Sequence, residues 1–98
     1  MYVKIHRSYR KIIAICDSEL LGKKFEEGKK QLDVRENFYK GEKFSLDKVA
    51  GIMKSERADD STFNIVGERA VKLAMNLGII FEGNIGNVDG IPFALILV

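Results

Sequence analysis

The sequence predicts a single α+β domain, in which a mostly antiparallel sheet has two main helices packed on one of its faces. Three observations indicate this class. Several short segments alternate apolar and polar residues, which is the period of a strand. Two longer segments repeat their apolar residues at every third or fourth position, as helices do. An Asp-Gly pair near the C-terminus is typical of a two-residue hairpin turn.

The composition is that of one domain spanning 1–98. Apolar residues make up 46% of the 98 residues and charged residues 31%, which is ordinary for a chain that buries a core. The only cysteine, Cys16, lies in the apolar run "IIAIC", so an intramolecular disulfide is excluded and a reducing compartment is indicated. No apolar stretch approaches the roughly 20 residues that span a bilayer. We therefore expect a cytoplasmic protein without a membrane partner.

The N-terminus reads as a β-hairpin. Two segments have the properties of strands, residues 2–7 and 12–17. The "SYRK" between them is short enough for a hairpin loop. If Arg7 pairs with Ile12, then His6 and Cys16 lie on opposite faces of the sheet.

The middle of the chain predicts short elements. Asp17 or Ser18 can cap one helical turn that stops near Gly22. Residues 30–35 alternate and are interpreted as a third strand of the sheet, followed by a turn over 36–43.

Two helices are predicted, over 46–55 and 64–77. Ser45 is a suitable N-cap for the first helix, and Gly78 lies where a left-handed residue closes the second. The stretch "FNIVGERAV" is unusual, because two β-branched residues and Gly67 are poor choices for the first turn of a helix. Close packing or a ligand is the reason to expect a bare backbone at this glycine.

The C-terminal tail predicts a second hairpin. Asp89-Gly90 joins "IGNV" to "IPFALILV", and Pro92 lacks the N–H for a ladder hydrogen bond, which places it at an edge or at the start of its strand. The run "FALILV" is too apolar for water and predicts a buried strand or an interface.

The residues do not predict a catalytic or metal site. The single histidine and single cysteine face apart in the expected hairpin, so a Cys-His dyad is disfavoured. A structural zinc site needs four Cys or His ligands, and the acidic segments "ERADD" and "FEEG" are interpreted as solvated loops. We expect no cofactor and no metal, and an enzyme is the third choice among function classes.

The charge distribution favours a nucleic-acid surface near the N-terminus. Residues 1–30 hold eight basic and four acidic side chains, giving +4, whereas the remainder carries −2. Cations could neutralise phosphates and rings could stack on unpaired bases. The alternative is a solvated hairpin tip. The candidate RNA-binding residues are Lys4, His6, Arg7, Tyr9, Arg10, Lys11, Lys23 and Lys24.

The start of the second predicted helix is a weaker candidate, for an anion. Free N–H groups and the positive end of the helix dipole favour an anion there. The alternative, which we favour, is that Gly67 permits close packing. The candidate anion-binding residues are Asn64, Ile65, Val66 and Gly67.

The chain also resembles a known family. The segments "AICDSELLGKKFEEG" and "NIVGERAV", with a closing "GIPFA", are similar to the archaeal domain of unknown function number four hundred and twenty-four. The resemblance covers nearly the whole chain. It implies an archaeal cytoplasmic α+β protein without an established activity, similar to families suspected of contacting RNA or the translation apparatus.

Two functions are therefore expected from different classes. The first is a non-enzymatic RNA-binding or translation-associated accessory protein, with RNA or a ribonucleoprotein as its partner. The second is a protein-interaction module or homodimer that uses the apolar C-terminal strand. A continuous basic face favours the first, and an open apolar edge favours the second.

Overall fold

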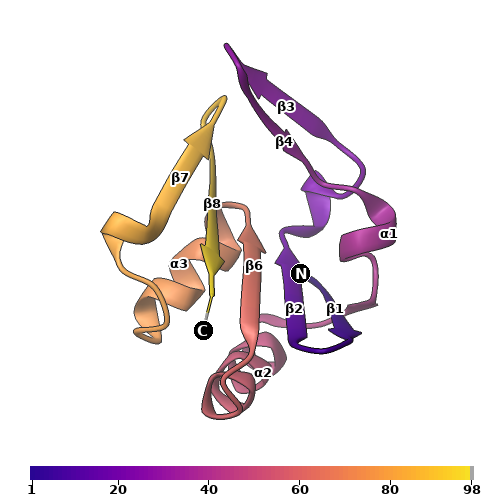
Figure 1. Cartoon of the computed structure of the whole chain (residues 1–98), viewed down its shortest axis with the longest axis vertical. Coiled ribbons are helices and arrows are strands. Elements are labelled where there is room, and N and C mark those ends of the chain that lie inside the picture. Colours follow the sequence, from indigo (N-terminus) through magenta and orange to yellow (C-terminus); the bar gives the residue numbers. More distant parts are fainter. Residues whose placement is uncertain (98) are drawn as a thin grey trace.

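The computed structural model describes residues 1–97, and a six-stranded sheet lies at its centre (Figure 1). Within these residues the strands are β1 (Tyr2–Arg7), β2 (Lys11–Cys16), β3 (Lys24–Glu27), β4 (Lys30–Asp33), β5 (Glu42–Lys43), β6 (Thr62–Val66), β7 (Ile85–Val88) and β8 (Ile91–Ile96). The helices are α1 (Glu36–Tyr39), α2 (Leu46–Ala58), α3 (Glu68–Asn76) and the 3-10 turns η1 (Ser18–Leu20) and η2 (Glu82–Asn84). The central sheet has the order β5-β1-β2-β6-β8-β7.

The predicted α+β class is confirmed, with α2 and α3 on the same face of a mostly antiparallel sheet. The main core lies between this face and the two helices. It includes Ile13 and Ile15 of β2, Phe63 of β6, Met53 of α2 and Ala70 of α3, all of which are buried. Only the β2–β6 pair is parallel within the described sheet.

The opposite face of the sheet has a second, smaller core that the sequence did not predict. Helix α1, η1 and the separate β3–β4 hairpin cover part of this face. Cys16, Val34 and Tyr39 are buried in this core, and Phe25 and Leu32 of the hairpin pack against it. In Figure 1 the β3–β4 hairpin projects from the upper end of the sheet, and the turn between β1 and β2 lies at the lower end.

The predicted register of the N-terminal hairpin is wrong by one residue. Arg7 pairs with Lys11 rather than Ile12, because the loop has three residues, 8–10, instead of four. His6 is therefore opposite Ile12, and it lies on the same face of the sheet as Cys16. The two residues are still far apart, since Cys16 is four positions further along β2, about 13 Å at the rise of a strand.

The prediction of one helix over 64–77 is also wrong at its start. Residues 62–66 form strand β6, and the helix begins only at Glu68. Ile65 and Val66 are strand residues with both neighbouring strands present, β2 on one side and β8 on the other. Their β-branched side chains suit a buried strand, which explains why they were poor choices for a helical turn.

Residues 30–43 differ from the predictions as well. The strand predicted over 30–35 is β4, which ends at Asp33 and pairs with β3 instead of joining the central sheet. The expected turn over 36–43 contains α1 and the short edge strand β5.

Several local predictions are confirmed. The Ser45 hydroxyl accepts a hydrogen bond from Lys48 N (3.4 Å), and the helix predicted over 46–55 continues to Ala58. Gly78 follows α3 with φ +71°, and Asp89 and Gly90 have φ 51° and 79° in the C-terminal turn. Pro92 lies at the start of β8.

Candidate nucleic-acid interface

The turn between β1 and β2 carries the most exposed part of the predicted basic surface. The side chain of Tyr9 is fully exposed, and Arg7 and Arg10 are exposed on either side of it. The Ser8 hydroxyl donates a hydrogen bond to the carbonyl oxygen of Arg10 (3.0 Å), which stabilises the turn. We call Arg7, Tyr9 and Arg10 the hairpin tip.

A recess lies beside the hairpin tip. Its volume is about 410 Å³, and one wall is formed by Tyr9, Arg10 and Lys11. The other wall is the turn after α2, with Asp59, Asp60 and Ser61. The recess therefore combines an aromatic ring and a guanidinium with hydrogen-bond acceptors.

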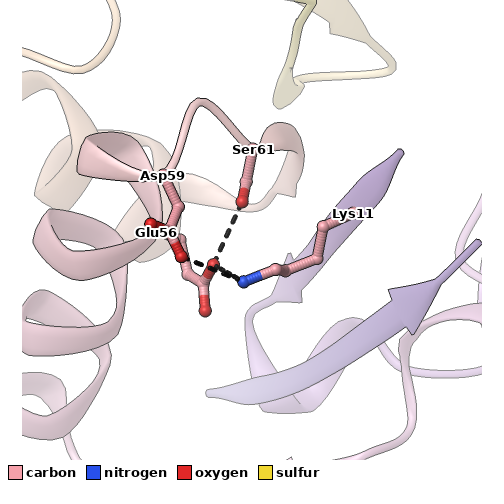
Figure 2. Close-up of polar contacts among 4 residues, drawn as sticks. All are labelled: Lys11, Glu56, Asp59 and Ser61. Carbon is pink, nitrogen blue, oxygen red and sulfur yellow. Dashed lines mark hydrogen bonds and ion pairs between the residues drawn. The ribbon is translucent and has the colours of Figure 1, made fainter. Parts of the chain in front are cut away.

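Lys11 is held by acidic residues of the α2 end. Its Nζ lies 2.8 Å from Glu56 Oε1 and 3.3 Å from Asp59 Oδ2, and the Ser61 hydroxyl donates to the same Glu56 oxygen (3.0 Å; Figure 2). The hydrogen bond to Glu56, and after it the one to Asp59, raises the pKa of the Lys11 ammonium above its usual value. Lys11 therefore connects β2 to α2, and its charge is balanced within the chain.

Lys4 and His6 contact α1 rather than the hairpin tip. The His6 ring stacks on Phe38 with centroids 4.5 Å apart, and its Nε2 lies 2.8 Å from the Phe38 carbonyl oxygen. Nε2 is therefore the protonated nitrogen in the neutral ring, because a carbonyl can only accept. Lys4 Nζ donates to the carbonyl oxygen of Asn37 (2.7 Å). Both side chains help to hold α1 against the sheet.

Lys23 and Lys24 lie away from the hairpin tip. They follow η1, which is beyond the Cys16 end of β2, whereas the tip precedes the Lys11 end. Lys24 Nζ is also 3.5 Å from Glu26 Oε1. Of the eight residues predicted for RNA binding, the structure brings together Arg7, Tyr9 and Arg10, with Lys11 beside them in an ion-pair network.

The segment Asn64–Gly67 is mainly strand, and an acid of this chain already lies at the start of the following helix. Asp17 accepts hydrogen bonds from the backbone N–H groups of Arg69 (3.0 Å) and Ala70 (2.9 Å). Gly67 has φ +110° and borders the same carboxylate, which only a residue without a side chain can approach so closely. The anion at this helix is thus the Asp17 side chain.

Asp17 is the residue that sequence reasoning missed. The sequence suggested it as a cap of the turn at 18–21, but its side chain caps α3, more than 50 residues further along the chain. It is 2% exposed. Desolvation raises the pKa of its carboxyl, and the two N–H groups act in the opposite direction. Only an Asp directly after a buried strand could have indicated such a role, and that signal is weak.

Cys16 is buried in the second core, and we expect it to be chemically inert in the folded protein. Burial raises the pKa of its thiol to about 12, so almost no reactive thiolate forms at neutral pH. Iodoacetamide at about pH 8 should label Cys16 only after unfolding in guanidinium chloride. Mass spectrometry of native and denatured samples is the measurement, and rapid labelling of the native chain would contradict the prediction.

Metal-binding and membrane-spanning features were also sought in the described part of the chain. Residues 1–97 contain no group of three or more His, Cys, Asp or Glu side chains arranged to hold a metal ion. None of the helices in this range is both long and apolar enough to cross a membrane.

The fold and the site define a small α+β protein with an exposed basic hairpin and no recognised catalytic arrangement. The chain belongs to the DUF424 family of proteins of unknown function, whose model matches residues 5–98. Its structure is similar to the crystal structure of an uncharacterized conserved protein from Methanopyrus kandleri, with a TM-score of 0.83 and 26% identity. That similarity covers 97% of this chain and 88% of the other. No curated protein matches the sequence.

Proposed function

We propose that this protein is a non-enzymatic, cytoplasmic RNA-binding accessory protein that contacts single-stranded RNA through the hairpin tip. The observation that carries the proposal is the fully exposed Tyr9 ring between two exposed arginines. Exposed aromatic rings next to cations are the common means of binding unpaired bases and their phosphates.

The recess beside the tip supports an unpaired base rather than a duplex. A base stacked on Tyr9 would have Asp59, Asp60 and Ser61 of the opposite wall near its edge. Carboxylates accept hydrogen bonds from the exocyclic amino groups of bases. Arg7 and Arg10 would then neutralise the flanking phosphates. A link to translation remains an expectation from the family resemblance.

The alternative, an interface formed by the edge of the apolar C-terminal strand, has less support. Strand β8 lies between β6 and β7, so both of its edges are already paired. Only side chains such as Leu95 and Leu97 remain exposed on it. An open strand edge does exist in this fold, but it belongs to β1.

We expect weak, salt-sensitive binding of a fluorescent single-stranded oligonucleotide. Arg7→Ala combined with Arg10→Ala should reduce the slope of log affinity against log salt by about 1.4, since each phosphate contact to a single strand contributes about 0.7. Tyr9→Ala should weaken binding by about tenfold with an unchanged slope, because stacking does not release counterions. Fluorescence anisotropy between about 50 and 200 mM KCl measures both effects.

The matched control is Lys29→Ala combined with Lys30→Ala, which removes the same charge from the exposed β3–β4 hairpin. This variant should bind RNA nearly as well as the wild type. If the control loses as much slope as the tip variant, attraction is a property of the net charge and the proposed site is wrong.

A further inference from the structure

Strand β1 has an open edge. Along its whole length it pairs with β2, but on the other side β5 pairs with only Tyr2 and Val3. Met1 and Phe44 exchange backbone hydrogen bonds in both directions, so the odd-numbered residues of β1 point their backbone groups towards this side. Within residues 1–97, the N–H and C=O of Ile5 and Arg7 therefore have no strand beside them. Such an edge is a template for another strand.

A groove runs between this edge and helix α2. It consists of two adjoining pockets, of about 270 and 330 Å³, that share Ile5 and Ile52. The first pocket has mainly apolar walls, which include Val3 and Phe44. The second extends along α2 past Gly51. A side chain of an added strand opposite Ile5 would point into this groove, because directly paired residues lie on the same face of a sheet.

Gly51 is the second observation that indicates an occupant. Glycine is, after proline, the least favourable residue in a helix interior, and Gly51 lies in the middle of α2. A Cβ atom at this position would have no heavy atom within 4 Å, so close packing inside the molecule does not explain the glycine. Its effect is to leave the wall of the groove bare.

The charges on β1 indicate the chemistry of the occupant. The strand carries Lys4 and Arg7 and no acid. Lys4 bonds only a neutral carbonyl oxygen among the contacts described, so its charge is not balanced there. Opposite charges on directly paired residues stabilise a sheet. On the α2 side, Asp47 and Lys48 cancel, and Glu56 is paired with Lys11.

We propose that the β1 edge and the groove beside α2 bind an extended acidic segment of a partner protein by β-strand addition. The added strand continues the line of β5, antiparallel to β1. Acidic residues lie opposite Arg7 and Lys4, and an apolar residue lies opposite Ile5 with its side chain in the groove. Main-chain hydrogen bonds supply affinity and the groove supplies specificity.

A second copy of this chain is a poorer occupant of the same edge. Symmetric pairing of β1 with another β1 would place Arg7 and Lys4 of one copy beside the same cations of the other. Like charges in directly paired positions are destabilising. Glu42 of β5 is the nearest acid at this edge, and it lies beyond the open part.

The test uses the full chain, labelled with ¹⁵N, and four capped hexapeptides of sequence Ser-Glu-Thr-Z-Glu-Ser, in which Z is Val, Leu, Ile or Phe. In this register Z is opposite Ile5. We expect at least one peptide to bind with a Kd of about 1 mM or tighter and to shift the amide signals of Ile5, Arg7 and Gly51. N-methylation of Z, which removes the N–H that donates to Ile5, should weaken binding at least tenfold, as should replacing both glutamates by lysine.

Gly51→Gln tests the groove without a change of charge. It should weaken peptide binding at least tenfold, leave the melting temperature equal or higher, and leave RNA binding unchanged. The matched control, Lys54→Gln, places the same side chain on α2 outside the groove-lining residues and should leave peptide binding within about twofold.

Three results would overturn the proposal. The first is the absence of shifts at Ile5 and Arg7 with all four peptides at about 1 mM. The second is equal binding of the N-methylated peptides. The third is a dimer in sedimentation equilibrium whose Ile5 and Arg7 amides are protected from exchange without peptide, because the edge would then belong to a second copy.

Discussion

Gly67→Ala should lower the free energy of unfolding by about 3 kcal/mol, the sum of a backbone and a packing contribution. Gly67 has φ +110°, a conformation that residues with a side chain rarely adopt. A methyl group there would also collide with Cγ of Asp17 and lie 2.5 Å from its Oδ2 and 2.7 Å from its Cβ. Asp17 cannot move aside easily, since two N–H groups hold its buried carboxylate. Urea denaturation of both proteins is the measurement.

Gly78→Ala separates the two contributions. Gly78 also has a positive φ, +71°, but its nearest neighbour for a new Cβ is Arg57 Nη1 at 3.9 Å, an ordinary contact. This control should lose only about 1 kcal/mol, from the backbone alone. A loss at Gly67 no larger than the loss at Gly78 would show that the approach of Asp17 does not matter.

Asp17→Ala should destabilise the protein by about 3 kcal/mol, because it leaves two N–H groups at the start of α3 without an acceptor in a buried position. The lost charge at the positive end of the helix adds to the effect. Thermal or urea unfolding gives the value. Asp47→Ala is the matched control, since Asp47 is an exposed acid in the first turn of α2 and should contribute less than 1 kcal/mol. Similar losses in the two variants would contradict the buried-cap interpretation.

The two sites should be coupled. Asp17→Ala removes the atoms with which a methyl group on Gly67 would collide, so the double variant should lose less stability than the sum of the single variants. Additive losses would mean that Gly67 and Asp17 act independently, and the contact between them would then have no energetic role.

The contribution of Asp17 should also depend on pH. Burial raises the pKa of the carboxyl above its usual value of 3.8, so the folded chain holds this proton more tightly than the unfolded chain. The stability linked to this proton is fully present below the unfolded pKa and is lost as pH rises through the folded pKa. The difference in unfolding free energy between the wild type and Asp17→Ala should therefore be larger at about pH 3.5 than at about pH 7. A difference that grows with pH would reverse the sign of the shift.

The candidate interface was predictable only in part. Exposed residues at a hairpin turn, such as Tyr9 and Arg10, follow from the alternation of the flanking strands, because a turn must lie at the surface. The sequence could not show that Lys11 pairs with Glu56 of α2 or that His6 stacks on Phe38, since each contact joins residues more than 30 positions apart. The open edge of β1 depends likewise on the length of β5, which two residues define.

The sequence by itself determined the α+β class, the two hairpins with their turns, helix α2 with its Ser45 cap, and the end of α3 at Gly78. These features depend on local periodicity, capping and turn residues, which act over a few positions. Tertiary structure alone decided that residues 62–66 are a strand, because a strand buried on both faces has no alternation to reveal it. It also decided the role of Gly67, because the Asp17 carboxylate that fills the space beside it comes from a different part of the chain.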